Sequence, residues 1–210
     1  MSDDKPSLDA AYALKTPRDN QLLYADWAET YDSGFAAQMD YRLPQMVALM
    51  LSEVFMGPGP ILDVGAGTGL VAEHFPLRGV FDMDALDISP EMLKVAAAKG
   101  LYRNCIEGDL TGGLSLPDAR YGAIVSSGTF THGHVGPDAL DELLRVARPG
   151  AVFVLSINAK HFEARGFAKK FDALGDVITG LEHREVNIYG AGAEAAHRDD
   201  KARIAVFTKA

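Results

Sequence analysis

Hydrophobic and polar positions follow two different patterns on either side of residue 60. Before it, apolar residues recur with helical spacing, since Leu23, Trp27 and Tyr31 stand four residues apart and would share one face of a helix. This spacing predicts a helix over residues 20–37. A second apolar stripe predicts another helix over residues 43–55, with a proline tolerated in its first turn.

After residue 60, short apolar runs alternate with amphipathic helices. The expected strands cover residues 61–64, 80–86, 102–107, 121–126, 151–157, 182–189 and 203–208, and the expected helices cover 70–74, 90–99, 137–147 and 161–174. This alternation predicts an α/β fold with a seven-stranded, mostly parallel sheet and helices on both faces. The last two strands have no helix between them, so we expect the last strand to be antiparallel at the edge.

Length and composition predict one globular domain. The chain has 210 residues, 48% of them hydrophobic, which is enough apolar surface for a proper core. We expect a loose arm over residues 1–19 and a single domain over residues 20–210. Within that domain, residues 20–57 would be helical, residues 58–158 would form the core, and residues 159–210 would supply a C-terminal helix and edge strands.

Charge and cysteine content narrow the class of protein. The formal net charge of −9 argues against a nucleic-acid partner, because phosphate binding needs clustered Lys and Arg. The longest apolar run, residues 46–51, is far shorter than the roughly 20 residues of a membrane span, so we expect no membrane association. The single Cys105 and the acidic, polar start of the chain favour a cytoplasmic protein without a signal peptide.

A glycine-rich turn follows the first predicted strand. Residues 61–69 have the sequence Ile-Leu-Asp-Val-Gly-Ala-Gly-Thr-Gly. Glycine is needed where the backbone turns sharply or approaches a ligand without a Cβ in the way, so three alternate glycines between a strand and a helix favour a nucleotide-binding loop. The third glycine comes one residue too early for the dinucleotide fingerprint, and no Gly-Lys-Ser/Thr follows as in a P-loop.

With four later motifs, this turn resembles the class I S-adenosylmethionine-dependent methyltransferases. The matching motifs are the acidic residue and glycines of 63–69, Asp-Ile-Ser at 87–89, Gly-Asp-Leu at 108–110, the strand approach at 121–125 and Arg-Pro-Gly at 148–150. The resemblance implies a Rossmann-like fold, an N-terminal helical lid over residues 20–57, and S-adenosylmethionine as cofactor.

The resemblance also implies which residues bind the cofactor. Asp87 would accept hydrogen bonds from the ribose hydroxyls, since charge-assisted bonds are the stronger ones. Ile88 and Leu110 would enclose the adenine, and Asp109 would accept from its amine. The complete expected set is Tyr24, Tyr31, Asp63, Gly65, Ala66, Gly67, Asp87, Ile88, Met92, Asp109, Leu110 and Ser126.

An aromatic group stands in the predicted lid. The stretch Tyr-Ala-Asp-Trp-Ala-Glu-Thr-Tyr-Asp at residues 24–32 is similar to a Y-x-x-x-A-x-x-Y-D feature of many family members, in which aromatic hydroxyls reach the carboxylate of the cofactor. The resemblance therefore implies cofactor contacts for Tyr24 and Tyr31. The alternative is that these side chains only pack the helix onto the rest of the domain.

Two histidines follow the fourth predicted strand, where an acceptor would arrive. His132 and His134 are candidates for a general base, and a surface position without function is the alternative. A metal site needs further ligands, so we expect no metal. The strand end also lacks the Asp of metal-dependent catechol methyltransferases and the Asn-Pro-Pro-Tyr of adenine methyltransferases. Asn158 and the N-terminal helices are expected to shape the acceptor pocket.

The leading hypothesis is methyl transfer from S-adenosylmethionine to a small-molecule acceptor by direct displacement. A non-catalytic regulator that binds the cofactor is the first alternative, because fold does not determine function. An NAD-dependent oxidoreductase is the second, and the early third glycine counts against it. No motif specifies the acceptor or an oligomeric state.

Overall fold

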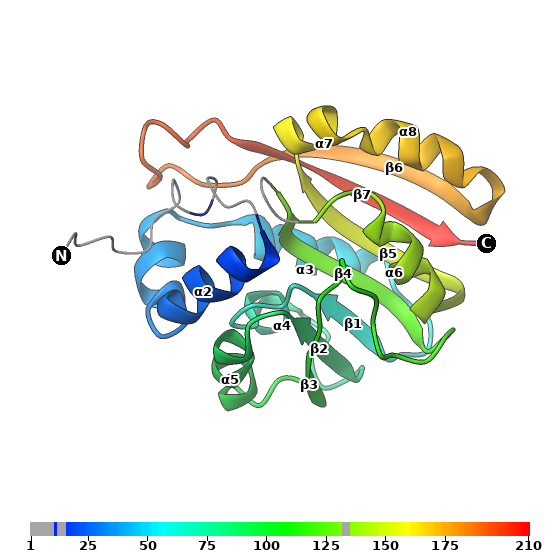
Figure 1. Ribbon diagram of the computed structural model, residues 1–210, viewed down its shortest axis with the longest axis horizontal. Helices are drawn as coiled ribbons and strands as arrows, with labels where there is room; N and C mark the ends of the chain where they lie inside the picture. Colours follow the sequence, from blue (N-terminus) through cyan, green and yellow to red (C-terminus); the bar gives the residue numbers. More distant parts are fainter. Residues whose placement is uncertain (1–10, 12–15, 132–134) are drawn as a thin grey trace.

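Seven strands form one sheet in the order β3-β2-β1-β4-β5-β7-β6 (Figure 1). The computed structural model describes residues 11, 16–131 and 135–210. The strands are β1 Ile61–Val64, β2 Met83–Asp87, β3 Asn104–Glu107, β4 Tyr121–Phe130, β5 Ala147–Asn158, β6 Ile178–Asn187 and β7 Lys201–Lys209. Strands β1 to β5 pair in parallel, whereas β7 is antiparallel to β5 and β6. The predicted seven-stranded, mostly parallel fold is confirmed.

In one detail the sheet differs from the prediction, because the last strand lies inside it. β7 pairs with β5 on one side and with β6 on the other, so β6 forms the edge. The burial of the two strands explains the order. Most positions of β6 are exposed, whereas Ala202, Ile204, Ala205 and Phe207 of β7 are buried. A strand that is buried on both faces suits the sheet interior.

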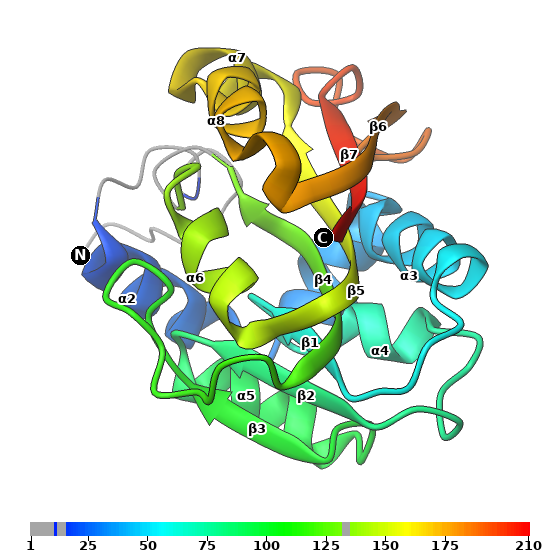
Figure 2. The same cartoon turned by 90° about the vertical axis from the view of Figure 1, so that its right-hand side faces the viewer.

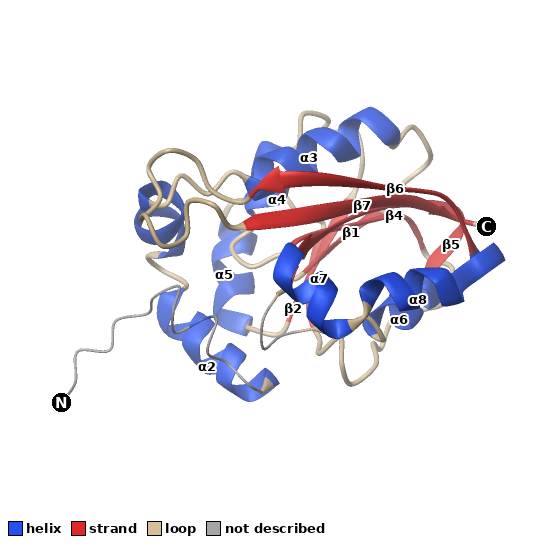
Figure 3. Cartoon of the chain, turned by 90° about the horizontal axis from the view of Figure 1, so that it is seen from above, coloured by secondary structure: helices blue, strands red, loops and turns tan. Residues whose placement is uncertain are grey.

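Helices cover both faces of the sheet, with α3 and α4 on one side and α6, α7 and α8 on the other (Figures 2 and 3). Their bounds are α2 Pro17–Trp27, α3 Leu43–Val54, α4 Leu70–His74, α5 Pro90–Ala98, α6 Ala139–Val146, α7 Ala159–Arg165 and α8 Phe167–Leu174, with a short 3-10 helix η2 at Gly175–Val177. Neighbouring β4 residues point to opposite faces. Ile124 therefore joins the core with Leu143 of α6, while Val125 joins the core with Val47 of α3.

The N-terminal helix begins earlier and ends earlier than its hydrophobic spacing predicts. Thr16 and Asp19 cap it reciprocally, each side chain accepting from the backbone N–H of the other at 3.1 Å. This capping box starts α2 within the predicted arm, and the arm residues 1–10 and 12–15 lie outside the described residues. After α2, a π-helical segment η1, Tyr31–Ala36, continues the lid.

The predicted helix over residues 161–174 is also divided in two. Gly166 lies between α7 and α8 with a φ of 74°, a left-handed conformation that glycine adopts without steric cost. Because the apolar spacing continues across this residue, the sequence pattern indicates the helical content but not the bend.

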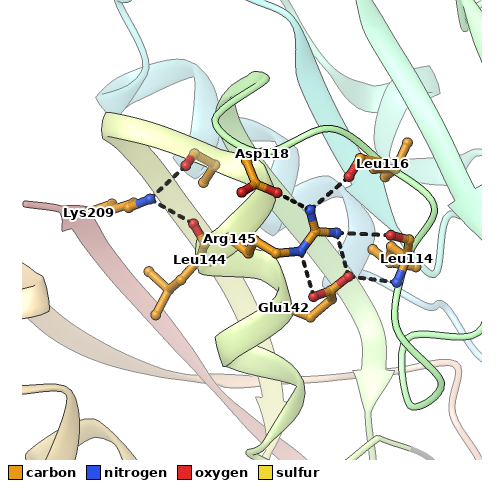
Figure 4. A network of polar contacts seen from close by, with 8 residues as sticks. Leu114, Leu116, Asp118, Glu142, Leu144, Arg145 and Lys209 are labelled. Carbon is orange, nitrogen blue, oxygen red and sulfur yellow. Dashed lines mark hydrogen bonds and ion pairs between the residues drawn. The ribbon is translucent and has the colours of Figure 1, made fainter.

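Arg145 of α6 fixes the loop that runs from β3 to β4 (Figure 4). Its guanidinium donates to the carbonyls of Leu114 and Leu116 at 2.9 and 2.8 Å, and it forms ion pairs with Glu142 and Asp118. Glu142 accepts in turn from the Leu114 N–H at 2.6 Å. A single cation therefore bonds to two loop carbonyls and to two carboxylates at once.

Candidate functional site

One cleft opens at the carboxyl ends of the parallel strands, beneath the N-terminal helices. Residues at or just after the ends of successive strands line it, including Val64, Asp87, Gly108, Thr129 and Asn158. In parallel α/β sheets, ligands bind at this edge. The helix α2 lies at the same end of the molecule (Figure 1), and its Gln21 side chain donates to the Ile88 carbonyl at 3.1 Å.

The glycine turn between β1 and α4 forms the floor of the cleft. Gly67 has a φ of 54°, and a Cβ added there would meet no atom within 4 Å. Gly65 also has a positive φ, but a Cβ there would collide with the Thr129 side chain. The two glycines therefore serve different purposes: Gly65 permits close packing against β4, while Gly67 leaves its backbone open to the cleft.

Asp87 stands at the end of β2 and holds the glycine turn in place. Its two carboxylate oxygens accept from the Gly67 N–H at 2.8 Å and from the Ser89 N–H at 2.9 Å. Burial raises the pKa of Asp87, while these backbone hydrogen bonds and that of Ile88 oppose the rise. Each carboxylate oxygen has two lone pairs, so Asp87 retains capacity to accept hydroxyl groups of a ligand.

An apolar slot lies beside Asp87. Ile88 lines it from the residues before α5, Met92 from the first turn of α5, and Leu110 from the loop after β3. Asp109 reaches the same cleft, and its Oδ1 accepts from the N–H and the hydroxyl of Thr111 at 2.8 and 2.6 Å. The slot thus combines apolar walls with a carboxylate at its rim, an arrangement suited to a flat, amine-bearing ring.

Aromatic side chains of the lid line the part of the cleft that contains Asp87 and the glycine turn. The ring centroids of Trp27 lie 6.0 Å from Tyr24 and 5.3 Å from Tyr31. Trp27 is buried and packs with Met92 of α5. Burial raises the pKa of Tyr31 well above its usual value, so its phenol stays protonated and can donate. These side chains both pack the lid and line the cleft.

All predicted cofactor-binding residues line the cleft except Asp63 and Ser126. Asp63 is fully buried behind the glycine turn, where its Oδ2 accepts from the Tyr102 hydroxyl at 2.6 Å. Ser126 is equally buried and donates to the Val64 carbonyl at 2.7 Å. Both side chains are thus buried and bonded within the protein rather than exposed in the cleft, and their assignment to the cofactor stays a prediction.

A polar network that the sequence interpretation missed ties the lid to the glycine turn. Asp32 of η1 accepts from the Thr68 hydroxyl at 2.5 Å and from the Lys99 ammonium at 2.6 Å. Lys99 also donates to Glu73 of α4 at 2.7 Å. Burial acts to lower the pKa of Lys99, but the two carboxylates outweigh it and raise that pKa. The Tyr-Asp pair at residues 31–32 was the one feature of the sequence that could have pointed to this network.

The other half of the cleft, on the β4 and β5 side, is lined by neutral residues. Tyr41, Ile188 and Tyr189 form part of its wall, and Ser127 and Asn158 form part of its floor. The side-chain oxygen of Asn158 accepts from two backbone N–H groups of α7 at 3.0 and 3.2 Å, so this residue both caps a helix and borders the cleft. Asn158 was expected here from the sequence, whereas Tyr41 and Tyr189 were not.

The predicted base candidates, His132 and His134, lie outside the described residues. Thr131 and Val135, on either side of them, line the cleft. Among the described lining residues, the charged side chains are those of Asp87 and Asp109. Within residues 11, 16–131 and 135–210, no group of three or more His, Cys, Asp or Glu side chains is arranged to hold a metal ion.

The fold is shared with solved structures. The [4+2]-cyclase SpnF aligns with a TM-score of 0.69 and 16% identity, covering 93% of this chain and 97% of that one. A TehB-like SAM-dependent methyltransferase from Corynebacterium glutamicum aligns with a TM-score of 0.60 and 21% identity, covering 89% and 98% of the two chains. At these identities the likeness concerns the fold alone.

Sequence comparison is more specific. The family model described as "Methyltransferase domain" matches residues 62–155. Methyltransferase-like protein 27 of Homo sapiens is 33% identical over 153 residues, which are 70% of this chain and 61% of that protein. Residues 62–155 therefore form a methyltransferase domain of the class I S-adenosylmethionine-dependent family. The match covers the glycine turn, Asp87 and Asp109, and the cofactor of the family is S-adenosylmethionine.

Two bacterial relatives of this methyltransferase domain have informative names. The malonyl-(acyl-carrier protein) O-methyltransferase of Serratia marcescens is 33% identical over 169 residues, 77% of this chain and 58% of that protein. The demethylmenaquinone methyltransferase of Renibacterium salmoninarum is 32% identical over 143 residues, 68% and 60% of the two proteins. The chain thus spans 58–61% of the length of these three relatives. In the part of the chain that the structure describes, no helix has the length and hydropathy of a membrane span.

Proposed function

We propose that this protein transfers a methyl group from S-adenosylmethionine to a small-molecule acceptor by direct displacement. The observation that supports this most directly is that the glycine turn, Asp87 and the aromatic lid converge on one cleft at the carboxyl edge of the sheet. A second, neutral compartment adjoins them in the same cleft. Two ligands can thus meet there under one lid.

The described residues fit the cofactor. Asp87 has acceptor capacity for the two ribose hydroxyls, and Gly67 leaves open space above the turn. In this proposal Ile88 and Leu110 enclose the adenine and Asp109 accepts from its amine. The hydroxyls of Tyr24 and Tyr31 reach the carboxylate, while Gly65 and Ala66 shape the turn. Asp63 and Ser126 act from behind it.

The chemistry asks the protein chiefly for alignment. When bound, S-adenosylmethionine supplies a sulfonium-activated methyl group, which the lone pair of the acceptor takes while the sulfur keeps the electrons of the broken bond. Alignment of two reactants can contribute about 7–11 kcal/mol in favourable cases. A hydroxyl acceptor also loses its proton, and His132 and His134 are the proposed candidates for the base.

Two observations support a small acceptor. The relatives whose names state an acceptor act on demethylmenaquinone and on malonyl-(acyl-carrier protein). In addition, no Lys or Arg lies among the described residues that line the cleft, whereas binding of a nucleic acid backbone requires such residues.

Calorimetry tests the cofactor, and label transfer tests the reaction. We expect S-adenosylmethionine and S-adenosylhomocysteine to bind and NAD not to bind, since the third glycine precedes its place in the dinucleotide fingerprint. Protein incubated with methyl-labelled S-adenosylmethionine and a small-molecule extract should then transfer the label, and S-adenosylhomocysteine should inhibit the transfer. Binding of NAD in place of S-adenosylmethionine would refute the proposal.

A second candidate function is binding of the cofactor without methyl transfer. SpnF, which has the same fold, is named a [4+2]-cyclase, and this illustrates that the architecture is not restricted to one chemistry. Tight binding of S-adenosylmethionine, with no label transferred to any fraction of the extract, would favour this second function.

A further inference from the structure

Three aromatic rings form one wall of the neutral half of the cleft. Phe35 comes from η1, Tyr41 from the segment before α3, and Tyr189 from the segment after β6. The centroid of Tyr41 lies 5.6 Å from both Phe35 and Tyr189, and Phe35 lies 6.2 Å from Tyr189. We call these three residues the aromatic wall. The three rings pack on one another and all line the cleft, so they give a ligand an aromatic, apolar surface.

Backbone pairing holds the aromatic wall in place. Tyr41 and Tyr189 form an antiparallel β-bridge. Next to it, the Arg42 N–H donates to the Ile188 carbonyl at 3.1 Å, and the Gly190 N–H donates to the Asp40 carbonyl at 2.8 Å. The lid and the β6–β7 connection are therefore joined at this point, so the wall is formed before a ligand arrives, which lowers the entropic cost of binding.

The compartment beside the aromatic wall offers no positive charge among the described residues. Its remaining lining includes Leu43, Pro44 and Ile188, and its floor is formed by uncharged hydroxyl and amide side chains. Arg42, which is near in sequence, pairs with Asp40 at 2.7 Å and is exposed. Burying a carboxylate without a partner is costly, and the described lining residues offer no cationic partner to an anionic ligand.

Neutral hydrogen-bonding groups stand at the end of the compartment. The Tyr41 hydroxyl lies against the backbone of Gly128, 2.7 Å from the position that a Cβ would take there. Burial raises the pKa of Tyr41 to about 12, against the effect of a hydrogen bond with Ser127, so its phenol remains protonated. Ser127, with a buried hydroxyl, is the adjacent floor residue.

We propose that the methyl acceptor is an uncharged, planar aromatic hydroxyl compound, which stacks on the aromatic wall and directs its oxygen toward Tyr41 and Ser127. This inference rests on the proposed function, because it identifies the ligand class for the acceptor half of the same cleft. Flat rings match the wall, and a neutral oxygen matches the polar groups without the desolvation cost of an anion.

Matched probes test the inference on the wild-type protein loaded with S-adenosylhomocysteine. We expect 1-naphthol to bind at least about tenfold more tightly than 1-naphthoate, which adds a charge, and than 1-decalinol, which loses planarity, a free-energy difference of about 1.4 kcal/mol. Equal or tighter binding of either control probe, or no binding of 1-naphthol, would overturn the inference. Protein that does not bind S-adenosylhomocysteine at all would instead refute the proposed function, and the inference with it.

Variants locate the probe. Tyr41→Phe removes only the hydroxyl and Tyr189→Leu removes one ring; we expect each to weaken 1-naphthol binding by roughly three- to tenfold, or about 0.7–1.4 kcal/mol, with affinity for S-adenosylhomocysteine retained. Phe81→Leu is the matched control and should leave 1-naphthol binding unchanged, because the Phe81 ring packs at a tilt against Phe55, with centroids 4.9 Å apart, and neither residue lines the cleft. Retained S-adenosylhomocysteine binding shows that a variant is folded. Wild-type affinity for 1-naphthol in both tyrosine variants would overturn the inference.

Discussion

At the scale of single residues, Asp87 is the proposed partner of the cofactor ribose. Its carboxylate already accepts from Gly67 and Ser89. We expect Asp87→Ala to weaken S-adenosylmethionine binding by about 1.5–3 kcal/mol, the range for hydrogen bonds to a charged group, as measured by calorimetry. Asp176 is an exposed residue of η2 and does not line the cleft. Asp176→Ala is therefore the control, and it should bind S-adenosylmethionine as the wild type does. Wild-type affinity in Asp87→Ala would contradict the ribose assignment.

Alanine substitutions at Gly65 and Gly100 distinguish the cost of backbone strain from the cost of a steric collision. Both have a left-handed φ, 64° and 66°, but only at Gly65 would a Cβ collide with another side chain, that of Thr129. The conformational cost of alanine should be similar at both positions, about 1–2 kcal/mol. We expect Gly65→Ala to lower the free energy of unfolding by a further amount of roughly 1–3 kcal/mol, as overpacking does. Urea unfolding of the two variants measures the difference.

Asp63 shows what residue patterns leave undetermined at this scale. The sequence identifies the acidic residue before the glycines, but the side of the turn that its carboxylate faces depends on Tyr102, which lies 39 residues further along the chain. Long-range partners of this kind have no local signature. Asp87 was easier to interpret, since it ends a strand at the edge where parallel sheets bind ligands.

Among the elements, the lid depends on a small ionic network. Lys99 joins Asp32 of η1 to Glu73 of α4. We expect Lys99→Met to weaken S-adenosylmethionine binding and to increase amide hydrogen exchange over residues 31–36, because Asp32 would lose its cation. Lys94→Met, on an exposed position of α5, is the matched control. Unchanged exchange in Lys99→Met would show that the network does not hold the lid.

Element boundaries were predictable where a capping residue or a glycine marks them. Ser89 caps α5 by accepting from the Met92 N–H at 3.3 Å, as its place before a proline predicts. The N-terminal helix was less predictable, because the aromatic spacing continues through both α2 and η1. Trp27 of α2 and Tyr31 and Phe35 of η1 pack in one cluster. The spacing therefore indicates the shared face correctly, although the backbone changes from α-helical to π-helical between them.

For the whole molecule, the sequence predicted the sheet and the edge at which parallel sheets bind ligands, but not the aromatic wall. The glycine turn and Asp87 belong to consecutive strands, so their meeting follows from parallel topology. Tyr41 and Tyr189 come from distant parts of the chain and meet through a single β-bridge. Tyr189 follows β6, the edge strand that β7 separates from β5, and a bridge between residues so far apart in the sequence has no local signature.

Stability of the whole molecule should depend on pH through Asp63. Burial raises the pKa of this carboxyl from 3.8 to about 7, against the effect of the Tyr102 hydrogen bond, and its Oδ1 has no hydrogen-bond partner among the described residues. The folded protein therefore retains a proton that the unfolded chain releases near pH 4. Stabilisation from this group is complete below that pH and declines as the pH rises to about 7.

We therefore expect the unfolding free energy of the wild type to fall relative to Asp63→Asn by at most about 1.4 kcal/mol per pH unit between pH 4.5 and 7. Asparagine keeps the acceptor for Tyr102 but cannot ionise. Glu142, whose pKa Arg145 lowers to about 2, is ionised in both states above pH 5 and contributes little slope in this window. Urea unfolding at several pH values measures the difference, with Asp176→Asn expected to follow the wild type. Parallel curves for wild type and Asp63→Asn would mean that the buried carboxyl ionises in the folded protein at its ordinary pKa.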